Sequence, residues 1–223
     1  TSDVTLKAGT TYKLSGEYIV EAGATLNIEA GVKIIYVYDD IVDYILIKQG
    51  AKINAMGTAN APIVMTSGKE EPGAWGGIHI CGKAHTNAEG GKGSSEIGGA
   101  VYGGHDDADN SGKLQYVRVE YTGYAFDEEH EANGITFYGV GNGTIVDHCQ
   151  AYKGSDDGFE FFGGSVNISN MVVVSCSDDS FDWTEGWNGK GTDLVAYQEP
   201  KATLGYDCDC LIEADNNEND NAA

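Results

Sequence analysis

The chain has 223 residues and a formal net charge of −22, because 35 aspartates and glutamates outnumber 13 lysines and arginines. Nucleic acids are bound by clustered basic side chains, so this balance excludes them as partners. No run of 18 apolar residues is present, which argues against a membrane-spanning helix. The length and the 41% hydrophobic content fit one elongated domain over residues 1–223. The chain starts at Thr1 without a leader peptide, which indicates a processed or trimmed start.

Residues 4–67 alternate β-branched and polar side chains in bursts of four or five, separated by glycine-containing turns. This pattern is typical of short β-strands and has no helical period. We expect the inward side chains to stack as aliphatic ladders, whose buried area stabilises the fold by roughly 25 cal/mol per Å². The predicted inward residues are Ile19, Leu26, Ile28, Ile45, Ile47, Ile53 and Ile63.

A Gly-rich, polar loop insertion interrupts the pattern near residues 83–111. Long loops inside compact domains are usually functional. Within the insertion, Asp107, Asp109 and Ser111 precede a glycine and have the oxygen spacing of calcium loops. The acid that would complete a helix-loop-helix calcium site falls at Arg118, so that motif is excluded. A solvated acidic turn explains the same residues equally well.

The segment SDDGFEFFGG at 155–164 recurs as SDDSFDWTEG at 177–186. Asp157 thereby matches Asp179, and a weaker copy that starts at Asn133 lies 24 residues before Asp157. A short period of strand-like segments is the signature of a solenoid in which each repeat forms one coil. We predict an all-β, right-handed parallel β-helix with coils of about 22–24 residues.

Acidic side chains recur in both copies of the repeat. Adjacent coils of a β-helix lie about 4.8 Å apart, so like carboxylates in one column nearly touch. Either a cation separates them or their pKa values rise. Calcium at Asp157 and Asp179 is one hypothesis, and no organic cofactor is indicated. In the other, each aspartate caps a turn by accepting backbone N–H groups.

The same acids allow a catalytic alternative. In it, Asp157, Asp179 and Asp182 act as in β-helix polysaccharide hydrolases, whose inverting carboxyl pairs stand about 6.5–9.5 Å apart. The Gly-His-Gly and Arg-x-Lys segments of polygalacturonase-like enzymes are missing, and Arg118 is the only arginine. The net charge repels anionic polysaccharides, which favours a neutral glycan.

Aromatic residues follow the acidic repeats. Some alternate with acids and are predicted to stack inward; these are Phe159, Phe161, Phe181 and Trp183. Trp187 and Tyr124 are better placed to contact a sugar. The five cysteines are scattered and form no CxxC pair, so no disulfide framework is predicted. Cys149 is expected to act as a small buried hydrophobe.

Several segments resemble a known family, namely GTANAPIVMTS at 57–67, WGGIHICGKA at 75–84, the stretch 94–141 and SDDGFEFFGG. They are similar to secreted or lipid-anchored right-handed parallel β-helix proteins of Bacteroidetes and some marine Gammaproteobacteria. The resemblance implies that fold and export to the periplasm, outer membrane or cell surface, with a lipid anchor upstream of Thr1 as one means of attachment. It carries no biochemical activity. Relatives continue with further coils, so we expect the chain to be truncated at its C-terminal end.

The favoured hypothesis is a non-catalytic binding or scaffold protein of the cell envelope, whose acidic face binds Ca²⁺ and a glycan or partner protein. The alternative is a polysaccharide-degrading enzyme that acts on a neutral glycan. The predicted ligand contacts are Asp156, Glu160, Asp178, Glu185, Trp187 and Tyr124. The predicted metal ligands are Asp107, Asp109, Ser111, Asp157 and Asp179.

Overall fold

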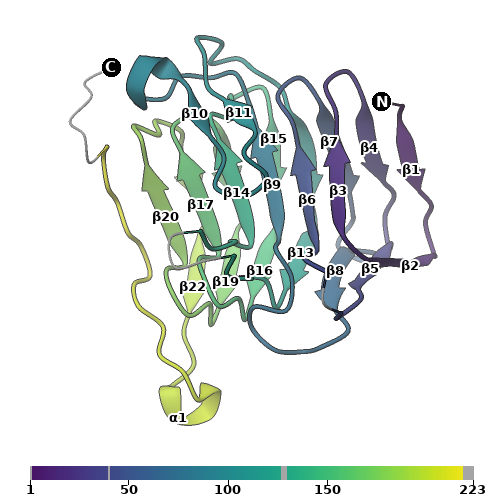
Figure 1. Ribbon diagram of the computed structural model, residues 1–223. Coiled ribbons are helices and arrows are strands. Elements are labelled where there is room, and N and C mark those ends of the chain that lie inside the picture. The colour runs from purple at the N-terminus through teal and green to yellow at the C-terminus, as the bar shows by residue number, and fades with distance from the viewer. Residues whose placement is uncertain (1, 40, 127–129, 218–223) are drawn as a thin grey trace.

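The computed structural model describes residues 2–39, 41–126 and 130–217. The chain winds through three long parallel sheets in a fixed order, and one strand from each sheet makes one coil. The two ends of the chain lie at opposite ends of the stack (Figure 1). Since all three sheets are parallel and helix is almost absent, the predicted right-handed parallel β-helix is confirmed.

Each sheet receives a strand from nearly every coil. Sheet A holds β1 (Val4–Leu6), β4 (Thr25–Ile28), β7 (Lys52–Met56), β12 (Gly112–Gln115), β15 (Ile145–Asp147), β18 (Asn167–Ser169) and β21 (Gly191–Thr192). Sheet B holds β2 (Thr11–Leu14), β5 (Lys33–Tyr36), β8 (Ile63–Ser67), β13 (Val117–Glu120), β16 (Gln150–Tyr152), β19 (Val172–Val174) and β22 (Val195–Tyr197). Sheet C holds β3 (Glu17–Val20), β6 (Tyr44–Ile47), β9 (Ile78–Cys81), β14 (Ile135–Tyr138), β17 (Phe159–Phe162) and β20 (Phe181–Thr184).

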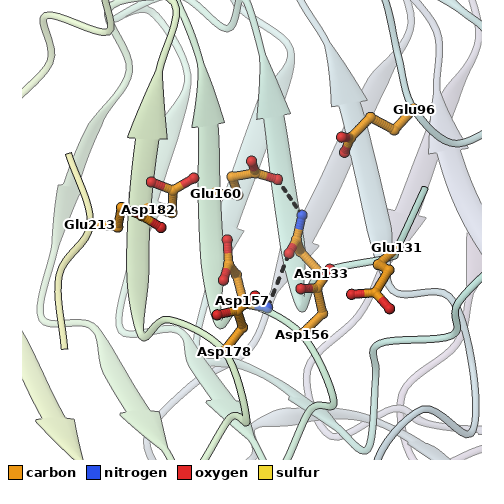
Figure 2. A pocket seen from close by; sticks show the side chains of 9 residues that line it. All are labelled: Glu96, Glu131, Asn133, Asp156, Asp157, Glu160, Asp178, Asp182 and Glu213. Carbon is orange, nitrogen blue, oxygen red and sulfur yellow. Dashed lines mark hydrogen bonds between the residues drawn. The ribbon is translucent and has the colours of Figure 1, made fainter. Parts of the chain in front are cut away.

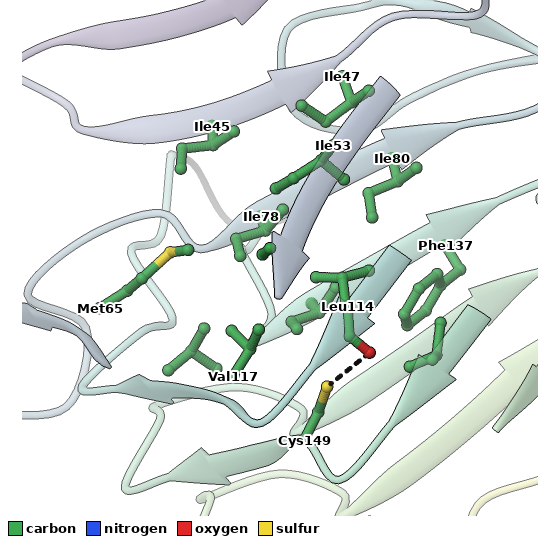
Figure 3. Packing of buried hydrophobic residues seen from close by; sticks show 14 of the residues in the cluster. Ile45, Ile47, Ile53, Met65, Ile78, Ile80, Leu114, Val117, Phe137 and Cys149 are labelled. Atoms are coloured by element: carbon green, nitrogen blue, oxygen red, sulfur yellow. Dashed lines mark hydrogen bonds between the residues drawn. The ribbon is translucent and has the colours of Figure 1, made fainter. Parts of the chain in front are cut away.

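Columns of similar side chains fill the interior of the coils (Figure 3). Phe159 pairs with Phe181, as the repeat predicts, and these two residues are buried. The rings of Phe137 and Phe161 are nearly parallel, with centroids 5.1 Å apart. Cys149 is buried in this core, as predicted, with its Sγ 3.7 Å from the carbonyl oxygen of Leu114. The stability of the fold therefore comes mainly from apolar burial along the axis.

Ile19 does not belong to the predicted inward ladder, although the other six aliphatic residues of that prediction are buried. β3 pairs with β6 so that Ile19 lies opposite Leu46 and Val20 lies opposite Ile47. Side chains alternate between the two faces of a strand, so Val20 points inward and Ile19 points outward, where it is 37% exposed. The prediction for Ile19 was wrong because a one-residue change of register exchanges the two faces.

The insertion predicted near residues 83–111 separates β9 from β12 and has structure of its own. It contains the 3-10 helix η1 (Glu89–Gly91) and an antiparallel hairpin of β10 (Gly93–Ser94) and β11 (Val101–Tyr102). The hairpin lies over the outward face of sheet C (Figure 1). A second hydrophobic cluster fills the space beneath it; its buried members are Tyr44, Leu46, Cys81, Ile97, Ala100, Tyr102, Ala132 and Tyr138.

The C-terminal segment extends sheet C beyond its last strand. After the short helix α1 (Lys201–Leu204), the chain returns along β20. The amides of Glu213 and Asp215 donate to the carbonyls of Phe181 and Trp183 at 3.0 and 2.9 Å. Glu213 is thereby placed beside β20. Within the described ranges, no helix is long and apolar enough to cross a membrane.

Candidate functional site

An acidic pocket of about 240 Å³ opens where the turns between sheets B and C meet the outward face of sheet C (Figure 2). Its lining consists of eight acids and one asparagine and includes no lysine, arginine or histidine among the described residues. The lining residues of this acidic pocket are Glu96, Glu131, Asn133, Asp156, Asp157, Glu160, Asp178, Asp182 and Glu213. Sheet C supplies Glu160 and Asp182, because β17 pairs with β20 so that these outward residues stack directly.

A ladder of turn caps builds the floor of the acidic pocket. The side-chain oxygen of Asn133 accepts the amide of Asp157 at 3.1 Å. One coil further, Oδ1 of Asp157 accepts the amide of Asp179 at 2.9 Å. Oδ1 of Asp179 then accepts the amide of Cys210 at 2.7 Å. The geometry thus bears out the turn-capping interpretation for Asp157, which fixes the turn of the following coil, while Asp179 holds the C-terminal segment instead.

Gly158, which follows Asp157 in the first acidic repeat, shows how tightly the turns of successive coils stack. A Cβ added to Gly158 would lie 2.6 Å from the carbonyl oxygen of Ser180 in the following coil. Only glycine therefore fits between the coils at this position. This close approach brings the carboxylates of successive turns together.

The turn caps leave other carboxylate oxygens to face the pocket. Asn133 also donates its amide to Oε2 of Glu160, so one side chain links the turn to the sheet (Figure 2). Oδ1 of Asp182 is shielded from solvent and has no hydrogen-bond partner among the described residues. A buried acceptor without a donor is costly, so this position favours a cation or a proton.

Burial raises the pKa of most of these acids. Desolvation, followed by the charges of Glu131 and Asp178, raises the pKa of Asp156 to about 7. Desolvation also raises the pKa of Glu96 to about 7, although the hydrogen bond from Tyr138 acts to lower it. The pKa values of Asp157 and Glu160 lie well above their usual range, mainly through burial and then through neighbouring carboxylates. Crowded acids in low dielectric can hold protons or can bind a cation in their place.

In the part of the chain that the structure describes, three overlapping triads of acids have one oxygen from each member within 4.8 Å of the others. They are Asp156–Asp157–Asp178, Asp157–Glu160–Asp182 and Asp179–Asp182–Glu213. Because the triads share Asp157 and Asp182, they form one continuous set. Several carboxylate oxygens converging at short range are the ligands that Ca²⁺ prefers. The spacing within the central triad is shorter than the separation of an inverting hydrolase pair.

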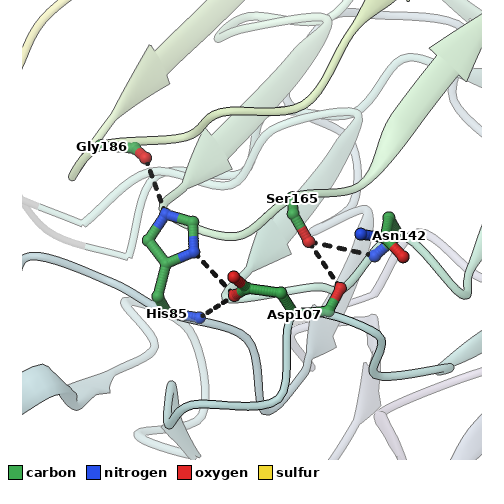
Figure 4. Close-up of polar contacts among 5 residues, drawn as sticks. All are labelled: His85, Asp107, Asn142, Ser165 and Gly186. Carbon is green, nitrogen blue, oxygen red and sulfur yellow. Dashed lines mark hydrogen bonds and ion pairs between the residues drawn. The ribbon is translucent and has the colours of Figure 1, made fainter.

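The other predicted metal residues lie elsewhere. Asp107 accepts hydrogen bonds from the backbone N–H of His85 at 3.1 Å and from its Nδ1 at 2.8 Å (Figure 4). The other ring nitrogen of His85 lies 3.0 Å from the carbonyl oxygen of Gly186, so the contact fastens the insertion to the last coil. Asp109 is buried and accepts from the hydroxyl of Ser111 at 3.0 Å. The structure does not bring these residues into any of the three triads.

Three predicted ligand contacts lie outside the acidic pocket. Glu185 accepts from the hydroxyls of Thr86 and Tyr102, both on the insertion, at 2.5 and 2.9 Å. Trp187 stacks on the ring of Phe161 at 4.7 Å and donates to a backbone carbonyl, so it packs at the end of the core. Tyr124 is 36% exposed and lies at a separate pocket on the same corner of the solenoid.

Four pocket residues were absent from the predicted site. Asn133 carried a signal, because it aligns with Asp157 at the weaker third copy of the repeat. Glu96 comes from the insertion, Glu131 from the turn before β14 and Glu213 from the C-terminal segment. These three residues lie outside the two acidic repeats at 155–164 and 177–186, so the repeat period gave no reason to place them near Glu160.

The chain matches the family described as pectate-lyase-like β-helix domain over residues 1–223. It therefore belongs to that family. No curated protein and no solved structure shows significant similarity to it.

Proposed function

We propose that this chain is an exported β-helix protein of the cell envelope that binds Ca²⁺ in the acidic pocket and holds a glycan or a partner protein without turning it over. The convergence of eight carboxylates, with no basic side chain among the described residues of the lining, carries the proposal. A cation would offset the repulsion among these acids and satisfy the unpartnered oxygen of Asp182.

The arrangement of the pocket supports binding more than catalysis. Asp157 uses one oxygen to cap the next coil and Asp179 uses one to hold the C-terminal segment, which fixes both for a structural task. Anionic polysaccharides would meet a chain of net charge −22. A bound Ca²⁺ would lower that barrier locally and could present open coordination positions to hydroxyl or carboxylate oxygens of a ligand.

Isothermal titration of Ca²⁺ into EDTA-stripped protein tests the proposal. We expect saturable binding to the wild-type chain and at least about tenfold weaker binding to the Glu160→Gln/Asp182→Asn double variant, since both changes keep side-chain shape and remove charge. Glu89→Gln is the matched control, because Glu89 is an exposed acid on the insertion that lines no part of the pocket. Equal affinity in the double variant and the wild type, or no binding at all, would overturn the proposal.

Polysaccharide cleavage is the second candidate function. One observation favours it, namely the pKa of about 7 at Asp156 and Glu96, which would leave each partly protonated at neutral pH as a general acid must be. Release of reducing ends from a panel of neutral and acidic polysaccharides, in Ca²⁺ and in EDTA, distinguishes the two functions. Turnover that disappears in Asp156→Asn would replace the binding proposal with an enzymatic one.

A further inference from the structure

A second pocket, of about 270 Å³, opens on the same corner of the solenoid toward its N-terminal end. Two aromatic rings, Tyr38 and Tyr124, line it together with Ile41 and the carboxyl groups of Asp39 and Asp43. Described residues between β5 and β6 line most of this aromatic pocket, with Ala74 before β9 and Tyr124 after β13. It therefore combines flat apolar surfaces with hydrogen-bond acceptors, as pockets for small polar ligands do.

Neighbouring residues hold both rings in place. The ammonium of Lys69 lies 4.5 Å from the centroid of the Tyr38 ring and donates to its hydroxyl at 3.3 Å. Tyr124 meets Phe126 edge to face, with centroids 5.2 Å apart. Phe126 in turn packs edge to face on Tyr44 at 6.0 Å. Rings fixed in this way lose little conformational freedom when a ligand binds, yet Tyr38 is 57% exposed.

The two carboxyl groups differ in their roles. Asp39 accepts from the amide of Ile41 at 2.9 Å and from the hydroxyl of Ser15 at 3.0 Å, so it shapes the turn. Asp43 is 3% exposed and accepts the amide of Gly16 with Oδ1. No donor to its Oδ2 is found among the described residues. Burial raises the pKa of Asp43 to about 6, as expected of a carboxyl that a ligand hydroxyl would stabilise.

We infer that the aromatic pocket binds a neutral sugar ring of a glycan, with its apolar face on Tyr38 or Tyr124 and a hydroxyl donating to Asp43. This inference rests on the glycan-binding part of the proposed function and gives it a location distinct from the calcium site. The apolar C–H faces of a pyranose match the aromatic rings, and its hydroxyl donors match the carboxylates. The net charge of the chain disfavours an anionic sugar at a pocket whose two charged lining groups are acids.

The two pockets are linked along the chain. Tyr124 and Glu131 belong to the same turn, and the amide of Ala132 donates to the carbonyl of Tyr124 at 3.1 Å. The two pockets therefore border the same segment of the chain.

Titration calorimetry with hexasaccharides of glucose, mannose, galactose and xylose, run in Ca²⁺ and in EDTA, tests the inference, with hexagalacturonate as the anionic comparison. We expect at least one neutral hexasaccharide to bind, and Tyr124→Ala to weaken that binding at least about tenfold. Tyr124→Phe keeps the ring and should bind as the wild type does. Tyr197→Ala is the control, because Tyr197 is an exposed tyrosine of β22 that lines neither pocket.

Tyr38→Ala provides a second variant. Because the Tyr38 side chain is largely exposed, this variant should fold as the wild type does. Binding that falls in Tyr38→Ala or Tyr124→Ala while Ca²⁺ affinity stays unchanged supports the inference. Absence of binding by every neutral hexasaccharide, or unchanged affinity in both alanine variants, overturns it. Because Ca²⁺ binding is measured separately, failure of the sugar pocket is distinguishable from failure of the calcium proposal.

Discussion

The two faces of sheet C follow the same stacking rule with opposite energetic results. On the inward face, Phe159 stacks on Phe181, and Phe161 stacks between Phe137 and Trp187. On the outward face of the same strands, Glu160 stacks on Asp182. These two columns place like beside like, which stabilises apolar rings and destabilises carboxylates. The outward acids are therefore stabilised by a ligand or by protons, which is why we propose them as a binding site.

The largest effect should come from breaking the inward column. Phe161→Ala removes a fully buried ring that contacts its neighbours on both sides. We expect a loss of about 3–5 kcal/mol in the free energy of unfolding, measured by chemical denaturation. Tyr197→Ala, on an exposed side chain of the same end of the solenoid, is the control. A loss below about 1 kcal/mol would show that the column stabilises the fold less than its burial indicates.

Calcium should act on the outward column with the next largest effect. A ligand at a concentration 100 times its Kd stabilises the native state by about 2.7 kcal/mol. We therefore expect EDTA to lower the melting temperature, as followed by circular dichroism, and added Ca²⁺ to restore it. The double variant Glu160→Gln/Asp182→Asn should show a smaller difference between its melting temperatures in Ca²⁺ and in EDTA than the wild type does. A wild-type melting temperature that EDTA leaves unchanged would contradict the account.

Removing the charge of one outward acid should stabilise the calcium-free protein in EDTA. Glu160→Gln keeps the contact with Asn133 and removes a carboxylate beside Asp182. In EDTA at about pH 8 we expect a gain of roughly 1 kcal/mol in the free energy of unfolding, because folding raises the pKa of Glu160 and therefore costs free energy above the unfolded pKa. Asp157→Ala should have the opposite sign, since it removes the acceptor for the amide of Asp179. If both substitutions changed the free energy of unfolding in the same direction, the distinction between acids that repel each other and acids that cap turns would be wrong.

A pH dependence of stability is expected in EDTA. The folded-state pKa values of Asp156 and Glu96 are raised to about 7 from their usual values of 3.8 and 4.5. Stability from such groups is present below the unfolded pKa and is lost as pH rises through the folded pKa. The melting temperature should thus rise when pH falls from about 8 to about 5. Asp156→Asn/Glu96→Gln should flatten this trend, and a wild-type curve with the opposite slope would refute it.

The features of the structure that follow from the sequence repeat could be predicted from the sequence. The pairing of Phe159 with Phe181 and of Asp157 with Asp179 followed from the step between the two acidic repeats, and the fold followed from that period. Ile19 was placed on the wrong face because short strands without a repeat do not fix their register. Glu96 and Glu213 could not be assigned to the site, since the insertion and the C-terminal segment reach it through tertiary contacts.

The central claim is that a cation separates the carboxylates of the outward column. Crystals of the protein grown with Mn²⁺ in place of Ca²⁺ would test it through anomalous scattering. The account predicts an anomalous peak within coordination distance of the carboxylates of Asp157, Glu160 and Asp182. Well-ordered density for these three side chains without a peak between them would contradict it.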